Sequence, residues 1–175
     1  FPAVDMTVYS FHPVKHITTG EGGVVFTKDQ LLLKELKRWR SHGITNDPEE
    51  FLNQDIAFQH KESKERNPWY YEQIALGYNY RITDIQCALG LSQLRKLEGF
   101  KKRRREIVDT YNRLFGDVGC VQVPFETKDC VSNFHLYVLL FDFKKIGMNR
   151  ATLMNKLKEE NIQTQVHYIP VHLQS

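Results

Sequence analysis

Two short runs near the start of the chain are rich in β-branched and aromatic residues, at positions 7–11 and 24–27. Such residues fit the pleated surface of a β-strand. A Gly-Glu-Gly-Gly sequence, typical of a tight turn, stands at residues 20–23, directly before the second run. The pattern therefore predicts two strands joined by a loop.

An amphipathic helix is predicted after the second strand. Leu32, Leu36 and Trp39 recur at the spacing of one helical face. Asp29 is suited to cap the first turn, and Gly43 is suited to end the helix in a left-handed conformation. Both signals are local, so we expect this helix to begin and end close to these residues.

The composition turns polar and irregular over residues 44–77, with Asp-Pro and Asn-Pro pairs and a run of charged residues. A loop of this length is uncommon in a compact domain and is usually functional or mobile. We expect an irregular loop here, with the least order at residues 59–67.

The clearest helix start in the chain is Thr83 followed by Gln86, a pair that fits a capping box. Gly90 leaves room on this helix for another element to approach closely. Gly99 permits a break, and a second helical pattern follows over residues 100–115. We expect a domain boundary near Gly99.

The last part of the chain predicts a strand, a helix and a strand. Residues 134–143 have the pattern of a buried strand, and Asn149 is suited to cap a short helix that ends at Asn161. Residues 162–168 alternate between apolar and polar, as in a half-buried strand.

The order of these elements predicts an α/β fold. We expect residues 1–98 to form part of one domain and residues 99–175 to form a smaller, truncated α+β domain. The chain opens almost directly on a strand and lacks an initiator methionine, which suggests that it begins in the middle of a domain.

Composition narrows the class of protein. With 175 residues, 41% hydrophobic and 12% aromatic, the chain resembles an ordinary soluble globular protein. Its apolar runs are far shorter than the roughly 20 residues of a membrane span, and no signal peptide is visible. The net charge of +3, from 24 basic and 21 acidic residues, gives little support to nucleic-acid binding.

Cysteine and histidine spacing predicts neither a disulfide framework nor a metal site. The three cysteines are widely spaced and include no Cys-x-x-Cys pair, which favours a reducing cytoplasm. Two histidine pairs lack a carboxylate or cysteine at a recognisable ligand spacing. These residues are Cys87, Cys120 and Cys130, and the pairs His12 with His16 and His167 with His172.

A basic run at residues 101–105 stands on the second predicted helix. Glu98 and Glu106 lie three or four residues from its members, a spacing at which side chains on a helix pair. We interpret the run as a solvated, ion-paired face rather than a phosphate or nucleic-acid contact.

Lys15 is the candidate catalytic residue. It lies between the two predicted strands, among hydroxyl residues and turn glycines. A lysine at a fixed place can form a Schiff base with an aldehyde cofactor, and nearby hydroxyls and backbone N–H groups can hold a phosphate. The alternative is a surface lysine in a turn. The glycines are no dinucleotide fingerprint, because a strand follows them where a helix should.

Two motifs carry a resemblance to a known family. Ser-Phe-His-Pro-Val-Lys at residues 10–15, with Thr-Thr-Gly-Glu-Gly-Gly at residues 18–23, is followed by Gly-Tyr-Asn-Tyr-Arg at residues 77–81. In this order they resemble the DegT/DnrJ/EryC/StrS family of sugar aminotransferases, which use pyridoxal phosphate (PLP) and have the aspartate-aminotransferase type of fold. The resemblance runs over essentially the whole chain.

Within that family, three segments look most like the branch that serves pseudaminic acid biosynthesis, at residues 40–45, 67–72 and 166–172. The resemblance implies transfer of an amino group from L-glutamate to C4 of a UDP-linked 4-keto-6-deoxy-N-acetylhexosamine. Two alternatives remain open: action on another keto sugar, or a truncated binding module without catalysis.

The resemblance also implies roles for single residues. Lys15 would form the Schiff base with PLP and move a proton at the substrate carbon. Ser10 would hold the cofactor phosphate within its own subunit. Asn79 would reach the phosphate in the neighbouring subunit of a homodimer. Three further residues match segments that border the nucleotide-sugar pocket: Arg81, His167 and Tyr168.

The family's earlier half has no counterpart before Lys15. That half supplies the aspartate that pairs with the pyridine nitrogen, an aromatic ring stacked on the cofactor, and a helix N-terminus that binds the phosphate. The resemblance therefore implies a fragment that covers the middle and C-terminal part of the protein. This part comprises the C-terminal part of the large domain and most of the small α+β domain.

Overall fold

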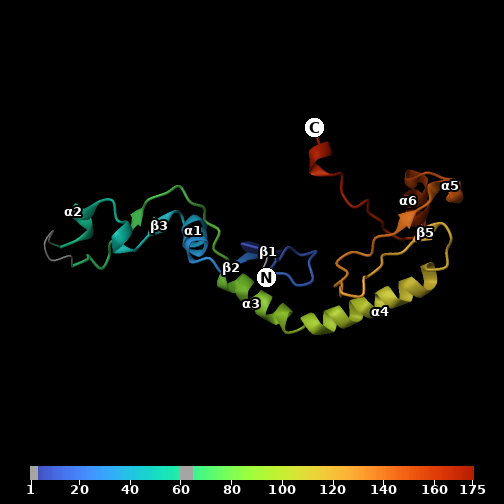
Figure 1. Ribbon diagram of the computed structural model, residues 1–175, viewed down its shortest axis with the longest axis horizontal. Helices are drawn as coiled ribbons and strands as arrows, with labels where there is room; N and C mark the ends of the chain where they lie inside the picture. Colours follow the sequence, from blue (N-terminus) through green and yellow to red (C-terminus); the bar gives the residue numbers. More distant parts are fainter. Residues whose placement is uncertain (1–3, 60–64) are drawn as a thin grey trace. The chain divides into compact units, whose positions relative to one another are not determined.

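The computed structural model of the chain describes residues 4–59 and 65–175 (Figure 1). The chain divides into two compact units, Phe1–Arg95 and Lys96–Ser175. Among the described residues, no helix combines the length and apolarity needed to cross a bilayer.

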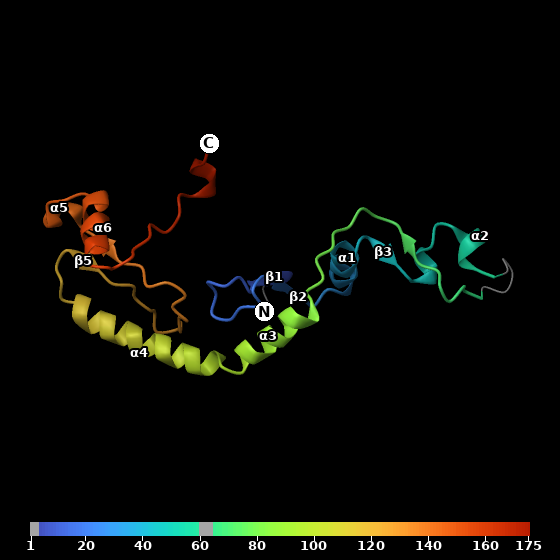
Figure 2. The same cartoon turned by 180° about the vertical axis from the view of Figure 1, so that it is seen from behind.

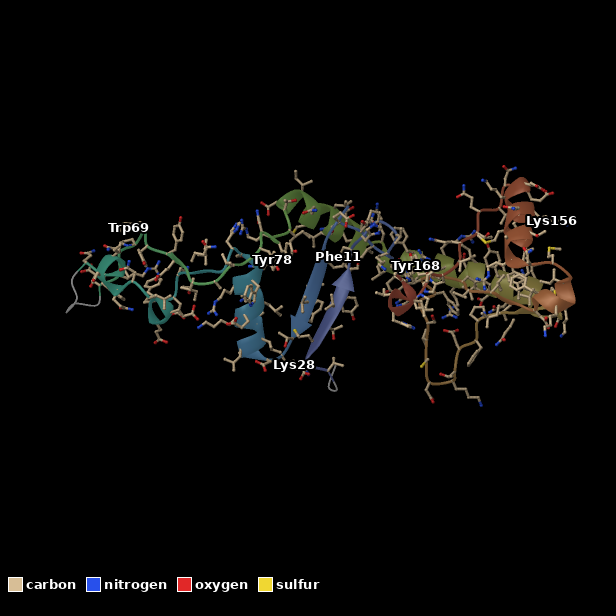
Figure 3. All side chains as sticks on the ribbon, turned by 90° about the horizontal axis from the view of Figure 1, so that it is seen from above. Phe11, Lys28, Trp69, Tyr78, Lys156 and Tyr168 are labelled. Carbon is tan, nitrogen blue, oxygen red and sulfur yellow. The ribbon has the colours of Figure 1, made fainter. Side chains whose placement is uncertain are left out.

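The first unit begins with an antiparallel hairpin of β1 (Met6–Ser10) and β2 (Gly23–Thr27). Its register pairs Met6 with Thr27 at one end and Ser10 with Gly23 at the other. Figure 3 shows Lys28 and Phe11 at opposite ends of this ribbon. The prediction of two strands joined by a loop is confirmed.

The helix α1 (Gln30–Arg40) follows the hairpin. Its cap is the expected one, because the Asp29 carboxylate accepts hydrogen bonds from the N–H groups of Leu31 at 2.7 Å and Leu32 at 3.1 Å. Gly43 adopts a left-handed φ of +69° and donates its N–H to the Arg38 carbonyl at 2.9 Å. Both local signals are confirmed.

The expectation of an irregular loop over residues 44–77 is confirmed for most of the described residues in it, which lie outside helices and strands, but not for all of them. The described part of this segment contains four short elements: β3 (Ile44–Thr45), the 3-10 helix η1 (Pro48–Glu50), α2 (Gln54–Ala57) and β4 (Glu72–Gln73). Strands β3 and β4 pair antiparallel. The two strands come from opposite ends of the segment, so no local pattern in the sequence indicates their pairing.

A small core stabilises this segment. Phe51, Ala57 and Tyr70 are buried, with the rings of Phe51 and Tyr70 edge to face at 4.8 Å. The expectation of least order at residues 59–67 falls partly on residues 60–64, which lie outside the described residues. On either side of them, Phe58 and Arg66 form a β-bridge.

Glu50 links η1 to α1. Its carboxylate lies 2.6 Å from Lys34 Nζ and 2.5 Å from Arg38 Nη2, and it accepts a hydrogen bond from the Thr45 hydroxyl at 2.6 Å. The hydrogen bond from Lys34, followed by that from Thr45, lowers the pKa of Glu50 below its ordinary value. These hydrogen bonds therefore favour the ionised form of Glu50 in the folded state.

The second unit begins with α4 (Leu97–Phe115), and Gly99 lies inside its first turn. The expected break at Gly99 is wrong, and the turn between the two long helices falls instead at Arg95 and Lys96. Glycine permits a break but does not impose one, because a helix tolerates it at a cost of about 1 kcal/mol.

The rest of the second unit is built from β5 (Val121–Gln122), β6 (Leu140–Phe141), α5 (Phe143–Ile146), α6 (Arg150–Glu159) and the 3-10 helix η2 (Val171–Leu173). Figure 2 shows these elements from the reverse side. Asn149 caps α6 as expected, accepting from the Thr152 N–H at 2.9 Å. The helix stops before Asn161, whose φ is +62°.

Of the two strands predicted in this unit, one is much shorter than expected, and the prediction of the other is wrong. Of residues 134–143, only Leu140–Phe141 pairs, because β5 offers two residues as partners. Residues 162–168 are exposed and pair with none of the described strands. Alternation in sequence indicates a strand only where a neighbouring chain supplies backbone partners, and that neighbour is not encoded locally.

The basic run on α4 is ion-paired, as predicted. Lys101 lies 3.1 Å from Glu98, Arg103 lies 2.9 Å from Glu106, and Arg105 pairs with Glu126. Arg104 donates to two backbone carbonyls, those of Phe134 and His135, each at 3.4 Å.

We predict that the Glu50→Gln variant has a lower melting temperature than the wild type at pH 7, because the amide loses the ionic attraction of Lys34 and Arg38. A carboxylate with a lowered folded-state pKa stabilises above its unfolded pKa, and this stabilisation is lost as pH falls. The difference between the two melting temperatures should therefore shrink as pH falls below about 4.5, measured by circular dichroism. Glu49→Gln, at an exposed position beside it, is the control; an equal shift there would contradict the assignment.

Candidate functional site

The loop that carries Lys15 connects β1 to β2 and is closed at Phe11. The Phe11 N–H donates to the Gly22 carbonyl at 2.8 Å. The Phe11 carbonyl accepts from the Thr18 hydroxyl at 2.9 Å and from the Thr19 N–H at 3.1 Å. Lys15, half-buried in this loop, donates its N–H to the His12 carbonyl at 2.9 Å. The lysine backbone is thereby fixed to the end of the hairpin.

The turn before β2 depends on its glycines and on Thr19. Thr19 is 4% exposed, and its hydroxyl donates to the Glu21 carbonyl at 2.6 Å. Gly20 has a φ of +82° and Gly22 a φ of +153°. A Cβ added at Gly22 would stand 2.4 Å from Thr19 Oγ1. The turn therefore accepts no side chain at position 22.

The helix α3 (Asp84–Leu94) supports this loop. Its capping box of Thr83 and Gln86 is formed as predicted. The Gln86 amide also donates to the Glu21 carbonyl at 2.9 Å. A Cβ added at Gly90 would come within 2.9 Å of Thr19 Cγ2, which confirms that Gly90 makes room for another element. The loop that carries Lys15 (residues 11–22, the lysine loop) therefore packs against α3. Gln86 contributes to this contact as well as to the helix cap.

The segment that carries Asn79 and Arg81 lies against the end of α1, where Figure 3 places Tyr78. The Tyr78 N–H donates to the Trp39 carbonyl at 2.7 Å, and the Tyr78 carbonyl accepts from the His42 N–H at 2.8 Å. Asn79 forms a β-bridge with Ser41. Main-chain bonds therefore hold this segment in register with the residues that end α1.

Two glycines make this approach possible. A Cβ at Gly43 would stand 1.9 Å from the Ala75 carbonyl oxygen, and one at Gly77 would stand 2.1 Å from the Gly43 nitrogen. Since the obstructing atoms belong to the backbone, neither position can accept a side chain without moving the segment.

The lysine loop and the Asn79–Arg81 segment are connected through Ile82, the residue after Arg81. Arg81 Nη2 lies 3.3 Å from His42 Nε2. The side chain of Ile82 lies so near the lysine loop that a Cβ at Gly22 would stand 3.3 Å from its Cδ1. The first unit thus joins the Lys15 loop to the Asn79–Arg81 segment through Ile82 and α3.

The other predicted residues are placed as follows. The Ser10 side chain is exposed, and its oxygen accepts from the His12 N–H at 3.3 Å, so its O–H remains able to donate. His167 and Tyr168 belong to the second unit, where both are exposed and their rings lie 5.0 Å apart. Asn79 and Arg81 are likewise exposed.

Across residues 4–59 and 65–175, no group of three or more histidine, cysteine, aspartate or glutamate side chains is arranged to hold a metal ion. An amine flanked by neutral hydroxyl and amide donors has the chemistry that an aldehyde cofactor with a phosphate requires. Ser10 ends β1 and Lys15 lies in the loop that follows it, whereas Asn79 lies on a separate segment that forms a bridge with Ser41.

Comparison with known proteins decides the family. The sequence profile of the DegT/DnrJ/EryC1/StrS aminotransferases matches residues 3–175. The chain belongs to this family. Aminotransferases of the family bind PLP, and solved structures of one similar protein include a PLP form and a PMP form.

Among the curated relatives, the spore coat polysaccharide biosynthesis protein SpsC of Bacillus subtilis is 38% identical over 170 residues, 97% of this chain and 41% of its own. A UDP-4-amino-4,6-dideoxy-N-acetyl-beta-L-altrosamine transaminase of Campylobacter jejuni is 35% identical over 169 residues, 96% of this chain and 39% of its own. The chain therefore spans about two fifths of the length of these relatives.

Solved structures confirm the fold class. PseC of Helicobacter pylori, an aminotransferase involved in the biosynthesis of pseudoaminic acid, matches with a TM-score of 0.80 and 31% identity over 98% of this chain and 41% of that one. The PLP form of Spr1654 from Streptococcus pneumoniae matches with a TM-score of 0.75 and 27% identity over 98% and 40%. The chain therefore forms part of the α/β fold of the PLP-dependent sugar aminotransferases, as predicted from the sequence.

We predict that Gly43→Ala lowers the free energy of unfolding by more than about 3 kcal/mol, because the new methyl group meets the Ala75 backbone in addition to the left-handed strain. Gly20→Ala is the matched control in the same unit, since Gly20 has a similar φ and no atom within 4 Å of the added Cβ. Gly20→Ala should lower the free energy of unfolding by only about 1–2 kcal/mol. Urea unfolding measures both; equal losses would contradict the close approach.

Proposed function

We propose that the intact protein transfers the amino group of L-glutamate to C4 of a UDP-linked 4-keto-6-deoxy-N-acetylhexosamine, in nucleotide-sugar biosynthesis of the pseudaminic acid type. The observation that carries the proposal is the Lys15 loop, closed at Phe11 and seated on α3, in a chain of an aminotransferase family. The names of the Campylobacter jejuni and Helicobacter pylori relatives support this sugar.

Lys15 has the central role in this proposal. Its amine would bind the cofactor aldehyde and then move a proton at the substrate carbon that receives the nitrogen. PLP, when bound, supplies the electron sink for that proton transfer. Ser10 would donate its hydroxyl to the cofactor phosphate from the same subunit, and Asn79 would donate its amide from the partner of a homodimer.

We take as substrate contacts the residues that the family resemblance assigns to the sugar pocket. Arg81, with an exposed guanidinium, is suited to a diphosphate, because its N–H groups match pairs of phosphate oxygens. His167 and Tyr168 would contact the sugar. We place the reaction in the cytoplasm, which the three free cysteines support.

A second candidate is amination of a different keto sugar. It is favoured by SpsC, which is named for spore coat polysaccharide biosynthesis and is as similar to this chain as the altrosamine transaminases. Assay of the intact protein with a panel of UDP-linked and TDP-linked keto sugars separates the two candidates.

We predict that Lys15→Ala in the intact protein removes the visible absorbance of bound cofactor and lowers transamination by at least about 10²–10⁴-fold. Lys28→Ala, at the opposite end of the hairpin, is the control and should retain both properties (Figure 3). Spectra before and after borohydride treatment, with an assay of glutamate consumption, give the readouts. A wild-type protein that binds the UDP-sugar but neither binds PLP nor consumes glutamate would show a non-catalytic binding module instead.

We further predict that mixing Lys15→Ala with Asn79→Ala subunits restores activity above that of either variant alone. If Asn79 serves the neighbouring subunit, each mixed dimer holds one site with both residues intact, so random mixing returns about a quarter of wild-type activity. Activity after denaturation and refolding of the mixture is the measurement. No gain on mixing would show that Asn79 acts within its own subunit.

A further inference from the structure

His42 has an unusual backbone that its neighbours hold in place. Its φ of +62° lies in the left-handed region, which residues other than glycine rarely adopt. Its N–H donates to the Tyr78 carbonyl at 2.8 Å, and its carbonyl accepts from the Gln73 amide at 2.9 Å. The backbone of His42 is thus bound on both sides by the segment that leads to Arg81.

The imidazole of His42 contacts the guanidinium of Arg81, with Nε2 and Nη2 at 3.3 Å. A guanidinium only donates hydrogen bonds, so Nε2 must be the acceptor. Such a contact orients the guanidinium and leaves its positive charge uncompensated.

Three of the other arginines in the described part of the chain are ion-paired. Arg38, Arg103 and Arg105 each form an ion pair with a glutamate. Arg81 is exposed, and its partner is an imidazole ring on a loop 39 residues away in sequence. The contact leaves N–H groups and a full charge available for an anion.

We propose that His42 is a positioning residue that holds the Arg81 guanidinium for a phosphate group of the nucleotide-sugar substrate. The inference rests on the proposed function, because it takes a nucleotide diphosphate as the ligand of Arg81. A guanidinium held at one edge presents its remaining N–H groups in a fixed fork, the geometry that suits two oxygens of a phosphate. The rigid backbone of His42 fixes where that fork lies.

The test measures whether His42 acts through Arg81. His42→Asn is the informative variant, because asparagine tolerates a left-handed backbone but is too short to reach the guanidinium. UDP is titrated by calorimetry into the intact protein as wild type, His42→Asn, Arg81→Gln and the double variant. Melting temperatures of the four proteins report any loss of structure.

We expect His42→Asn to weaken UDP binding about fivefold and Arg81→Gln to weaken it more, about tenfold or above. The double variant should bind like Arg81→Gln alone, because His42 has nothing left to position. The transamination KM for the UDP-sugar should rise in His42→Asn while kcat changes little.

Two outcomes would overturn the inference, and a third would overturn the proposed substrate. The His42→Asn change could weaken UDP binding by the same factor in the wild type and in Arg81→Gln, and also lower the melting temperature. That result would show a purely structural role and overturn the inference. So would unchanged UDP affinity in His42→Asn. Absence of UDP binding in the wild type would instead overturn the nucleotide-sugar substrate of the proposed function.

Discussion

Three hydrogen bonds meet at the main chain of Phe11, and the geometry of the candidate site depends on them. Its N–H binds Gly22, and its carbonyl binds both Thr18 and Thr19. A loop closed at one residue keeps little of the freedom that its length would otherwise give. Main-chain hydrogen bonds therefore hold Lys15 at the end of the hairpin.

The lysine loop contacts α3 through Thr19, a buried polar residue near the end of the loop. Its methyl group fits over Gly90 of α3, and Gln86 binds the carbonyl of the neighbouring Glu21. A two-stranded ribbon is marginally stable in isolation, and the residues Val8 and Phe26 are 73% and 54% exposed. The contacts with α3 are thus part of what holds the lysine loop in its conformation.

The Asn79–Arg81 segment is supported in a similar way. Main-chain bonds align it with the end of α1, and the glycines at positions 43 and 77 allow the backbones to meet. In both parts of the site main-chain hydrogen bonds contribute to the support, and the side chains of Ser10, Asn79 and Arg81 remain exposed. A change at a supporting glycine should therefore disturb the site as much as a change at a residue that binds ligand.

The sequence by itself determined the local features: the cap at Asp29, the capping box at Thr83 and the lysine loop between two strands. Each depends on groups within a few residues, so pattern and residue type suffice. Only the tertiary structure decided which extended segments pair, why Phe51 is buried, and that His42 meets Arg81. Those outcomes depend on partners far away in sequence, and the free energy of pairing belongs to both segments together.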